Sequence, residues 1–464
     1  MNTEQIANNK LPSLLYSAGQ GSAEFPPELF GDLKLDTLLS ERAIDSMRPI
    51  CAAADILPRQ AVFADCSAHL AEWQAASEAA LAFSHQYKEF GQARSEPERN
   101  YRFAALYELR ERFRELSRVL PGESGLVRAF REYFSGGLPA RIGVPDYISA
   151  GRAMFAVSSD TMFIKPYAEQ KTLAERLADC AERLGFPESL RSERTISIAP
   201  PVRVIESLSE LNAELFAELR EFYTAYSETL NSEEVKYADE LNLYTELAAL
   251  YRKVPHCLPK LSDVKQLKAR DLRDISLLAK DAAEIVPNDA EFTLETPVFF
   301  LVGANGGGKT TYLRSIGIAA VLGRSGFPVA AESCTLYPFS SVFTHFPREE
   351  RFEGTGRFGE EQRRVREILT AQDGGALILL NETYSTTGEA IAREQTALLA
   401  EEILRSGSFG LYITHQRDRD ERNIPVLTVV LREDNSRTYK ILSGGVKLGG
   451  SYARDILKKY GLDF

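Results

Sequence analysis

A glycine-rich loop directly after an apolar run is the part of this sequence best suited to chemistry. The loop extends from Gly303 to Thr310 and reads Gly-Ala-Asn-Gly-Gly-Gly-Lys-Thr, and the run before it is Val-Phe-Phe-Leu-Val. The loop fits the pattern G-x-x-x-x-G-K-[ST] in full, and a segment with helical periodicity follows it. Glycines let backbone N–H groups turn inward around phosphate groups, and the start of a helix adds partial positive charge. The loop therefore predicts a site that binds the phosphates of a nucleotide.

Individual residues of this loop have expected roles. Lys309 would reach the terminal phosphates, and the hydroxyl of Thr310 would bind Mg²⁺. The expected nucleotide-binding set within the loop is Gly303, Asn305, Gly306, Gly307, Gly308, Lys309, Thr310 and Thr311.

Two further apolar runs end in polar residues that such a site requires. The run Ala-Leu-Ile-Leu-Leu ends in Asn381 and Glu382, and Leu-Tyr-Ile-Thr ends in His415. Asn381 would hold the water shell of the metal, and Glu382 would act as general base toward the attacking water. His415 would hydrogen-bond the terminal phosphate or that water. The alternatives are a strand-ending carboxylate that faces solvent and an ordinary loop histidine.

The elements that must position these residues follow from the periodicity. In residues 286–464, strand-like runs alternate with helical ones, which predicts a mainly parallel sheet with its working end at the strand C-termini. Residues 1–285 are expected to be mostly helical. A small irregular insertion near 135–205 holds two short β-like runs around a Ser-Ser-Asp-Thr turn, and then a short strand at 195–202. We therefore expect an α/β domain preceded by a mostly α-helical domain.

Two segments of the helical half carry apolar stripes at helical spacing. In 102–120, Glu111 and Arg114 are expected to pair on the exposed face, and the stripe comprises Phe103, Leu106, Tyr107, Phe113, Leu116 and Leu120. In 205–230 the stripe is long enough for roughly 40 Å of helix. A helix of that length is either a lever arm or a helix that crosses a large core.

Composition narrows the class of protein. The chain has 464 residues, 44% of them hydrophobic and 26% charged, which is typical of a globular protein of two to four domains. No apolar run reaches the roughly 18 residues that span a bilayer, and the first ten residues do not have the pattern of a secretion signal. We therefore expect a cytoplasmic protein with no membrane contact. The net charge of −11 argues against broad basic patches for nucleic acid, although a local basic groove is compatible with it.

The cysteines and histidines predict no redox or metal centre. The five cysteines lie far apart, with no Cys-x-x-Cys pair, and the five histidines have no metal-ligand spacing. Buried free thiols are the expectation.

Three motifs, taken in order, resemble those of an ABC-type ATPase. They are the loop with its Lys-Thr-Thr-Tyr, the strand ending in Asn-Glu and the strand ending in Thr-His. The detailed sequence of these motifs resembles the MutS family of DNA mismatch-repair ATPases. The loop of that family reads G-P-N-x-G-G-K-[ST]-[ST]-[YFL], and this sequence departs from it at Ala304. Other segments that resemble the family are Val-Pro-Asn-Asp at 286–289 and the stretches 326–346 and 449–462. More faintly, 26–39 and the helical arms are similar to the core and lever domains of short MutS-like proteins, a subgroup with Asn-Glu in the second motif.

This resemblance implies a P-loop ABC-type ATPase domain at 286–464 and a helical core and lever domain at 1–285. It implies ATP and Mg²⁺ as cofactors, a homodimer formed through the ATPase domain, and DNA as a partner. It also adds Ile285, Gly356 and Arg357 to the expected nucleotide-binding residues. The last two belong to a signature segment that one subunit offers to its partner's nucleotide.

Two departures from the family pattern concern the chemistry. Asn381 replaces the usual Asp and carries no charge, so Mg²⁺ would be held less tightly and hydrolysis would be slow. The family signature Ser-Thr-Phe-x-x-Glu is here Gly-Arg-Phe-Gly-Glu-Glu at 356–361, without the hydroxyls. Gly356 would still offer its N–H to the γ-phosphate, and Arg357 would supply charge in trans. Alternatively, Arg357 is a surface residue paired with Glu360 or Glu361.

A third departure concerns mismatch reading, which the family performs with a Phe-x-Glu wedge on an N-terminal domain. Phe-x-Glu occurs here at 113–115 and 216–218, both inside helical stripes where the Phe would face a core. No separate recognition domain is expected before the core, and direct mismatch reading is not expected.

Three functions are compatible with these features. The leading one is an ATP-switched, dimeric MutS-like ATPase that binds DNA without reading a mispair. The second is a nucleotide-gated dimerisation or interaction module with weak turnover and no DNA binding, favoured by the acidic charge and the altered signature. The third is a transporter-associated ATPase, which the attached helical half disfavours.

Overall fold

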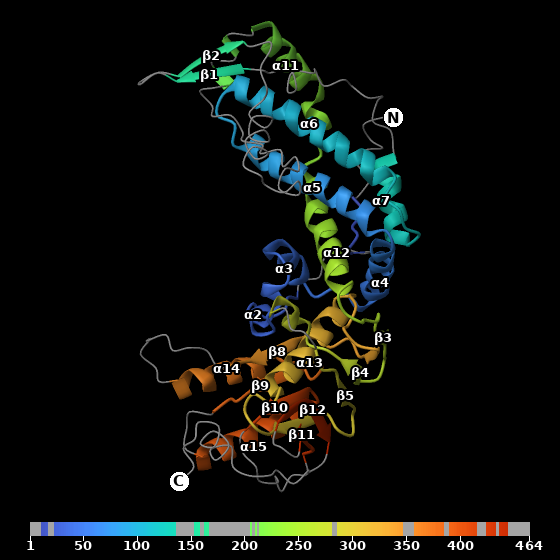
Figure 1. Ribbon diagram of the computed structural model, residues 1–464, viewed down its shortest axis with the longest axis vertical. Helices are drawn as coiled ribbons and strands as arrows, with labels where there is room; N and C mark the ends of the chain where they lie inside the picture. The colour runs from blue at the N-terminus through green and yellow to red at the C-terminus, as the bar shows by residue number, and fades with distance from the viewer. Residues whose placement is uncertain are drawn as a thin grey trace. The chain divides into compact units, whose positions relative to one another are not determined.

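A computed structural model gives the fold and divides the chain into two compact units. It describes residues 11–16, 23–135, 153–157, 162–166, 205–206, 209–210, 213–280, 285–346, 357–384, 389–414, 424–432 and 436–443. Unit 1 comprises Met1–Gln74, Pro121–Phe130 and Asp239–Phe464, and unit 2 comprises Ala75–Leu120 and Arg131–Ala238 (Figure 1). The grouping by contacts therefore differs from the division expected at residue 285, because residues on both sides of it belong to unit 1.

Unit 2 is built mainly from helices. α5 (Leu70–Gly91) and α7 (Gly125–Ser135) contain residues of both units, and the other elements are α6 (Glu96–Arg118), α11 (Ala213–Tyr226), η3 (Ser227–Thr229), η4 (Ser232–Lys236) and the strands β1 (Ala153–Val157) and β2 (Met162–Pro166). α6 begins at a capping residue, Ser95, whose side chain accepts a hydrogen bond from the N–H of Glu98. At 23 and 22 residues, α6 and α5 are about 35 and 33 Å long.

An aromatic core joins α6 to α11. Phe103 and Tyr107 of α6 pack with Phe222, at ring-centroid distances of 5.8 and 5.2 Å. Phe113 and Phe216 are buried, which confirms that the Phe of each Phe-x-Glu tripeptide faces the core of this unit.

The prediction of an exposed pair between Glu111 and Arg114 was wrong about exposure. The two charges lie 4.0 Å apart, but the Arg114 side chain is only 4% exposed. It shares a buried carboxylate, Glu234 of η4, with Arg110, and each arginine lies 2.8 Å from one carboxylate oxygen. Tyr133 also donates a hydrogen bond to Glu234. Burial, and to a smaller extent the negative charge of Glu234, raises the pKa of Tyr133 to about 12. The periodicity could not reveal this cluster because its acid lies 120 residues from Arg114.

The single helix predicted over 205–230 is also corrected. α11 ends at Tyr226, and the 3-10 turn Ser227–Thr229 follows it. The Thr229 hydroxyl donates to the carbonyl of Tyr226 at 2.7 Å, a local hydrogen bond of the kind that competes with helix continuation. The helix α11 has 14 residues, and the described residues 205–206 and 209–210 before it are also helical.

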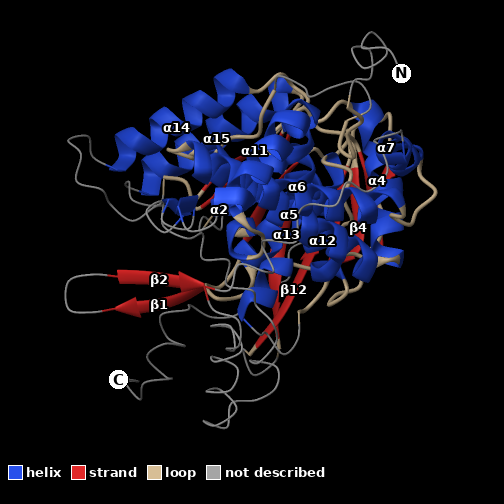
Figure 2. Ribbon diagram, turned by 90° about the horizontal axis from the view of Figure 1, so that it is seen from above, coloured by secondary structure: helices blue, strands red, loops and turns tan. Residues whose placement is uncertain are grey.

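The expected pair of short β-runs is confirmed. β1 and β2 form an antiparallel hairpin in which Ala153 pairs with Pro166 and Val157 with Met162 (Figure 2). The predicted strand at 195–202 lies outside the described residues.

Unit 1 holds two sheets. The larger has six strands in the order β12-β11-β6-β10-β9-β8, with only β12 antiparallel to its neighbour. Its strands are β6 (Val298–Val302), β8 (Val342–His345), β9 (Leu377–Asn381), β10 (Phe409–Ile413), β11 (Val426–Leu431) and β12 (Arg437–Ser443). The smaller, in the order β3-β7-β4-β5, comprises β3 (Lys260–Leu261), β7 (Ser333–Leu336), β4 (Leu267–Leu272) and β5 (Asn288–Phe292). The mainly parallel sheet was predicted; the smaller sheet was not, because part of it comes from the segment expected to be helical.

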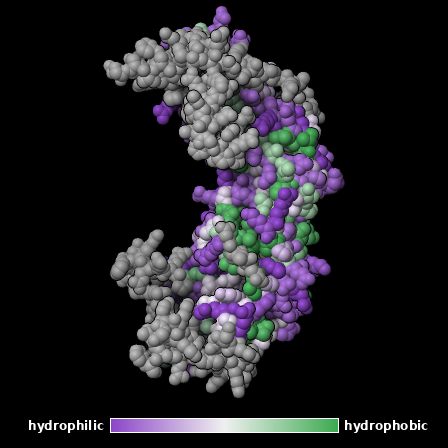
Figure 3. Space-filling model, in the orientation of Figure 1, coloured by the Kyte–Doolittle hydropathy of each residue, from purple (hydrophilic) through white to green (hydrophobic). Residues whose placement is uncertain are grey.

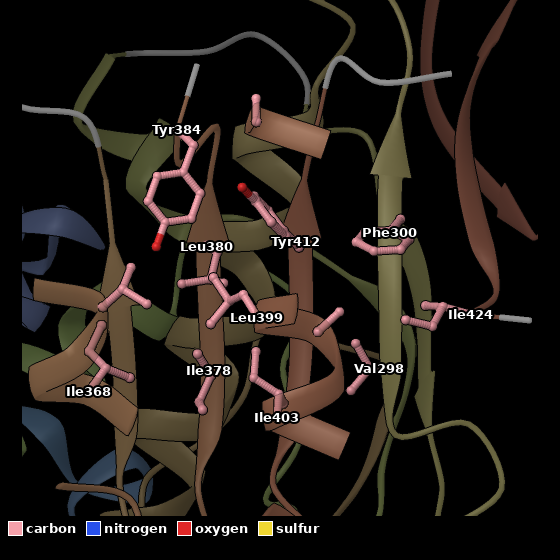
Figure 4. Packing of buried hydrophobic residues seen from close by; sticks show 13 residues of the cluster. Val298, Phe300, Ile368, Ile378, Leu380, Tyr384, Leu399, Ile403, Tyr412 and Ile424 are labelled. Carbon is pink, nitrogen blue, oxygen red and sulfur yellow. The ribbon is translucent and has the colours of Figure 1, made fainter. Parts of the chain in front are cut away.

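Helices cover both faces of the larger sheet. Figure 4 shows Leu399 and Ile403 of α15 (Glu389–Ser406) against Ile378, Leu380 and other side chains of the sheet, with Ile368 of α14 (Arg357–Ala371) in the same cluster. On the opposite face lies α13 (Lys309–Arg324), where a Cβ added to Gly317 would come within 2.8 Å of Leu379. Burial on both faces explains why the central strands read as uninterrupted apolar runs.

Helices from the N-terminal segment and residues 237–280 complete unit 1. They are α2 (Leu29–Asp32), η1 (Leu35–Thr37), α3 (Glu41–Met47), α4 (Ala53–Ala68), α12 (Tyr237–Tyr251, whose first two residues belong to unit 2) and η5 (Ile275–Lys280). Asp32 of α2 accepts from Thr344 at 2.8 Å and its carbonyl accepts from Arg314 at 3.1 Å, so α2 is attached to β8 and α13.

The cysteines that the structure describes form no disulfide. Cys51, Cys66 and Cys334 are buried and unbridged, while Cys257 is half-buried. The face of the molecule in Figure 3 carries hydrophilic residues with groups of hydrophobic ones among them. Among the described residues, no helix has the length and apolar character needed to cross a membrane.

We predict that Glu234→Ala lowers the free energy of unfolding by about 3–5 kcal/mol, because it leaves two buried guanidinium groups without their carboxylate. Chemical denaturation followed by circular dichroism measures the change. The matched control is Arg220→Ala, which removes the exposed Arg220–Glu96 pair of the same unit and should cost less than about 1 kcal/mol. Equal losses for the two variants would contradict the role given to Glu234.

Candidate functional site

The glycine-rich loop lies between β6 and α13, at the C-terminal edge of the larger sheet. Gly303, Gly306 and Gly308 have positive φ angles of 138°, 68° and 95°, a region that favours glycine. Gly308 is the N-cap of α13, which begins at Lys309. The first N–H groups of a 16-residue helix therefore open onto the loop, an arrangement suited to anions.

The loop closes tightly on β11 through one residue, Val429. A Cβ at Gly303 would lie 2.8 Å from the Val429 Cβ, and one at Gly307 would lie 2.7 Å from its Cγ1. Glycine at these two positions is thus required by close approach to a strand more than 120 residues away in the chain, and at Gly303 also by φ.

Lys309 is buried within the loop, with 4% of its surface exposed. Its ammonium donates to the carbonyl of Gly303 at 2.9 Å and to the side-chain oxygen of Asn305 at 3.1 Å. Burial lowers the pKa of Lys309, and the nearby carboxylate of Glu382 opposes that shift. The loop thus holds a cation whose charge is only partly offset by neutral oxygens.

The strand ends align the other predicted residues with this loop. Ile413 of β10 is in register with Leu301 of β6 on one side and with Asn381 of β9 on the other. The hydroxyl of Thr310 donates to the side-chain oxygen of Asn381 at 3.5 Å, so the two expected metal-binding residues are neighbours. Thr311 follows at the start of α13 and is half-buried.

Glu382 lies on a turn with unusual backbone geometry. Glu382 and Tyr384 have φ angles of 52° and 65°, which non-glycine residues rarely adopt. The N–H of Glu382 donates to the carbonyl of Ile413 at 3.0 Å, which continues the pairing of β9 with β10. Glu382 is half-buried directly after the C-terminal end of β9, and its role as general base stays a prediction.

Sequence reasoning missed the residues that support this turn. The Thr383 hydroxyl is 2.9 Å from Nδ1 of the buried His345, and the hydroxyl of Tyr412 donates to the Thr383 carbonyl. The N–H of Tyr384 donates to the carboxylate of Glu361 at 3.0 Å. Glu361 is the Glu of the signature segment 356–361, but no local pattern shows that it, Tyr412 and His345 contact this turn, since they come from α14, β10 and β8.

β12 contributes a second missed contact to the loop. The guanidinium of Arg437 donates twice to the carbonyl of Asn305, at 2.9 and 3.2 Å. Tyr439, two residues further along β12, has a φ of 58° and is 48% exposed. A Cβ built at Gly308 would lie 3.5 Å from the ring of Tyr439. The exposed edge strand therefore lies beside the loop.

The segment that follows Ile285 is also fixed near the loop. Asn288 is hydrogen-bonded to the backbone of Tyr439 and Ile441 at 3.0 and 2.8 Å, and Tyr312 of α13 donates to the carbonyl of Asp289 at 2.9 Å. Asn288 and Asp289 are the first residues of β5. Ile285 itself is half-buried.

The described residues include only part of three predicted positions, His415, Gly356 and Arg357. His415 and Gly356 lie outside the described residues, although Thr414 donates to the carbonyl of Leu301 at 3.1 Å. Arg357 is the first residue of α14, and its side chain lies outside the description, so both interpretations of it stay predictions.

Comparison with known proteins supports the assignment of this region. The family described as MutS domain V matches residues 299–430, from β6 to β11. Proteins named DNA mismatch repair protein MutS are similar over about half of the chain. The one from Staphylococcus epidermidis is 29% identical over 258 residues, which cover 54% of this chain and 28% of the relative. The one from Natronomonas pharaonis is 29% identical over 244 residues, which cover 51% and 27%.

These matches show that the segment around the loop and the larger sheet is similar to MutS domain V, and that about half of the chain is similar to MutS proteins. The aligned part spans less than a third of the length of these relatives. A helical N-terminal part with a mixed α/β sheet domain fits MutS domain V.

We predict that Gly307→Ala lowers the free energy of unfolding by about 1–3 kcal/mol through overpacking against Val429. In a Val429→Ala background the same change should cost at least about 0.5 kcal/mol less, because both Cγ atoms are gone. Thermal unfolding of the four proteins in this cycle provides the test.

Gly303→Ala is the comparison for this cycle, since its new Cβ meets both the Cβ and the Cγ2 of Val429 at 2.8 Å and its φ stays positive. Val429→Ala retains the Cβ and leaves φ unchanged, so it should rescue Gly303→Ala only in part. Absence of any rescue at Gly307 would show that the close approach to β11 is not the cause.

Proposed function

We propose that this chain is a MutS-like ATPase that binds ATP with Mg²⁺ in the loop 303–310 and hydrolyses it slowly. One observation carries the proposal: a fully matched phosphate-loop pattern ends in Lys309 and Thr310, and Asn381 lies at hydrogen-bond distance from Thr310 with Glu382 next to it. These are the residue types that phosphoryl transfer to water requires, at the open ends of parallel strands.

In the proposed reaction, the loop N–H groups and Lys309 bind the β- and γ-phosphates. The Lys309 ammonium would exchange its hydrogen bonds to loop oxygens for phosphate oxygens, which carry full charge. Glu382 accepts a proton from water as the water oxygen bonds to the γ-phosphorus, and the bond from that phosphorus to the bridging oxygen breaks to release ADP.

Mg²⁺ fits the donors present. A hydroxyl from Thr310 and an amide oxygen from Asn381 are hard ligands, and Mg²⁺ in such sites is bound mainly by phosphates and water. Among the described residues, no group of three or more His, Cys, Asp or Glu side chains could hold a metal alone. Mg²⁺ would neutralise charge on the phosphates, and the neutral Asn381 would bind its water shell more weakly than a carboxylate.

We further propose that ATP switches a dimer of this chain that binds DNA without direct reading of a mispair. Support comes from the similarity to MutS domain V and from relatives named DNA mismatch repair protein MutS. α14, which begins at Arg357 directly after Gly356, would complete the nucleotide site of the second subunit, with Arg357 supplying charge in trans. α5 and α6 have the length expected of lever helices.

A second candidate is a nucleotide-gated interaction module with weak turnover and no DNA binding. The uncharged Asn381 and the net charge of −11 favour it.

We predict that Lys309→Ala abolishes ATP binding in isothermal calorimetry with Mg²⁺, because it removes the only side-chain cation within the loop. Lys268→Ala, which alters an exposed pair with Glu291, is the matched control and should bind like the wild type.

Glu382→Gln should retain binding and lose at least about 100-fold in turnover. Equal turnover in Glu382→Gln and the wild type, with binding intact in both, would favour the interaction module.

For the DNA proposal, we predict ATP-dependent binding to at least one of duplex, branched or single-stranded DNA, with affinity that falls as salt rises. Fluorescence anisotropy at stated salt, with and without ATP, measures it, and sedimentation velocity follows dimer formation. Arg357→Ala should weaken the ATP-induced dimer. Absence of binding to all three DNA forms at low salt would remove DNA from the proposal and leave the ATPase.

A further inference from the structure

We propose that Glu361 is a positioning residue that connects the start of α14 to the turn carrying Glu382. The inference rests on the proposed ATPase function and concerns the regulation of the same site. Glu361 does not touch the loop 303–310; it would act through the backbone of the turn 382–384.

The contact is short and buried. One carboxylate oxygen of Glu361 accepts from the N–H of Tyr384 at 3.0 Å, and the residue is 5% exposed. A hydrogen bond from a backbone N–H to a buried carboxylate is charge-assisted and stronger than one between neutral groups. The acceptor is therefore well suited to hold the backbone two residues after Glu382.

The turn needs such support because of its backbone. Positive φ angles at Glu382 and Tyr384 persist only where the surroundings hold them. Loss of one support would let the turn relax toward commoner angles and would move the carboxylate of Glu382.

The supports come from two different sources. The carbonyl of Ile413, the hydroxyl of Tyr412 and the ring of His345 all belong to strands of the sheet. Among the hydrogen bonds to the described part of the turn given above, only that of Tyr384 to Glu361 comes from a helix.

That helix begins at Arg357, the second residue of the signature segment 356–361, and Glu361 is the last residue of this segment. Arg357 and Glu361 are four residues apart on α14, about one turn, and so lie on the same side of it. A movement at the start of α14, such as engagement of a second subunit's nucleotide, would reach the backbone of Tyr384 through the Glu361 carboxylate. The position of Glu382 would then depend on dimer formation.

The test compares Glu361→Ala, Glu361→Gln and the control Arg363→Ala, an exposed residue of the same helix that pairs with Glu367. Hydrogen exchange of a peptide covering 381–384 reports the contact without requiring activity. We expect faster exchange there in Glu361→Ala, near wild-type exchange in Glu361→Gln, whose amide oxygen still accepts, and no change in Arg363→Ala.

Turnover reports the positioning. Because binding groups are untouched, Glu361→Ala should lower kcat by about 10–100-fold while the Kd for ATP changes less than about 3-fold, and Glu361→Gln should recover most of kcat. Wild-type kcat in Glu361→Ala, unchanged exchange, or a parallel loss of binding and thermal stability would overturn the inference.

The two proposals fail separately. A wild-type protein that neither binds nor hydrolyses ATP contradicts the ATPase function, and the exchange data then decide alone whether Glu361 holds the turn. An active wild type with a fully active Glu361→Ala contradicts only the positioning role.

Discussion

The candidate site depends on one constraint, the in-register pairing of three buried parallel strands. β6, β10 and β9 place Leu301, Ile413 and Asn381 at the same level, and each strand continues directly into a polar segment. Parallel pairing with helices on both faces sends every C-terminal end to one edge. The glycine-rich loop, Glu382 and Asn381 come from distant parts of the chain and are thereby brought to the same edge of the sheet.

Close packing then decides the shape of the loop. Val429 lies against Gly303 and Gly307, Lys309 is surrounded by oxygens of the loop itself, and Arg437 holds the carbonyl of Asn305. The loop is therefore shaped by β11 and β12 as much as by its own glycines. The edge of the sheet contributes to the site although its sequence carries no recognisable motif.

Unit 2 is stabilised by a different combination of interactions from those that shape the loop. Its helices share an aromatic core and a buried carboxylate, Glu234, which compensates Arg110 and Arg114. Removing two guanidinium groups from water is costly, and the paired geometry with Tyr133 as a further donor offsets that cost. Such a cluster specifies how η4 docks on α6 more strictly than apolar contacts would.

The sequence alone determined the strands and helices around the loop, because uninterrupted apolar runs, glycines and helical stripes are local signals. It also determined which residue types could do chemistry, from Lys309 to Glu382, and the resemblance to MutS proteins. The tertiary structure decided what those signals cannot contain: the burial of Arg114, the end of α11 at Tyr226, the smaller sheet, and the contact between Glu361 and Tyr384. These depend on partners far along the chain, since burial and hydrogen bonding are properties of neighbours in space.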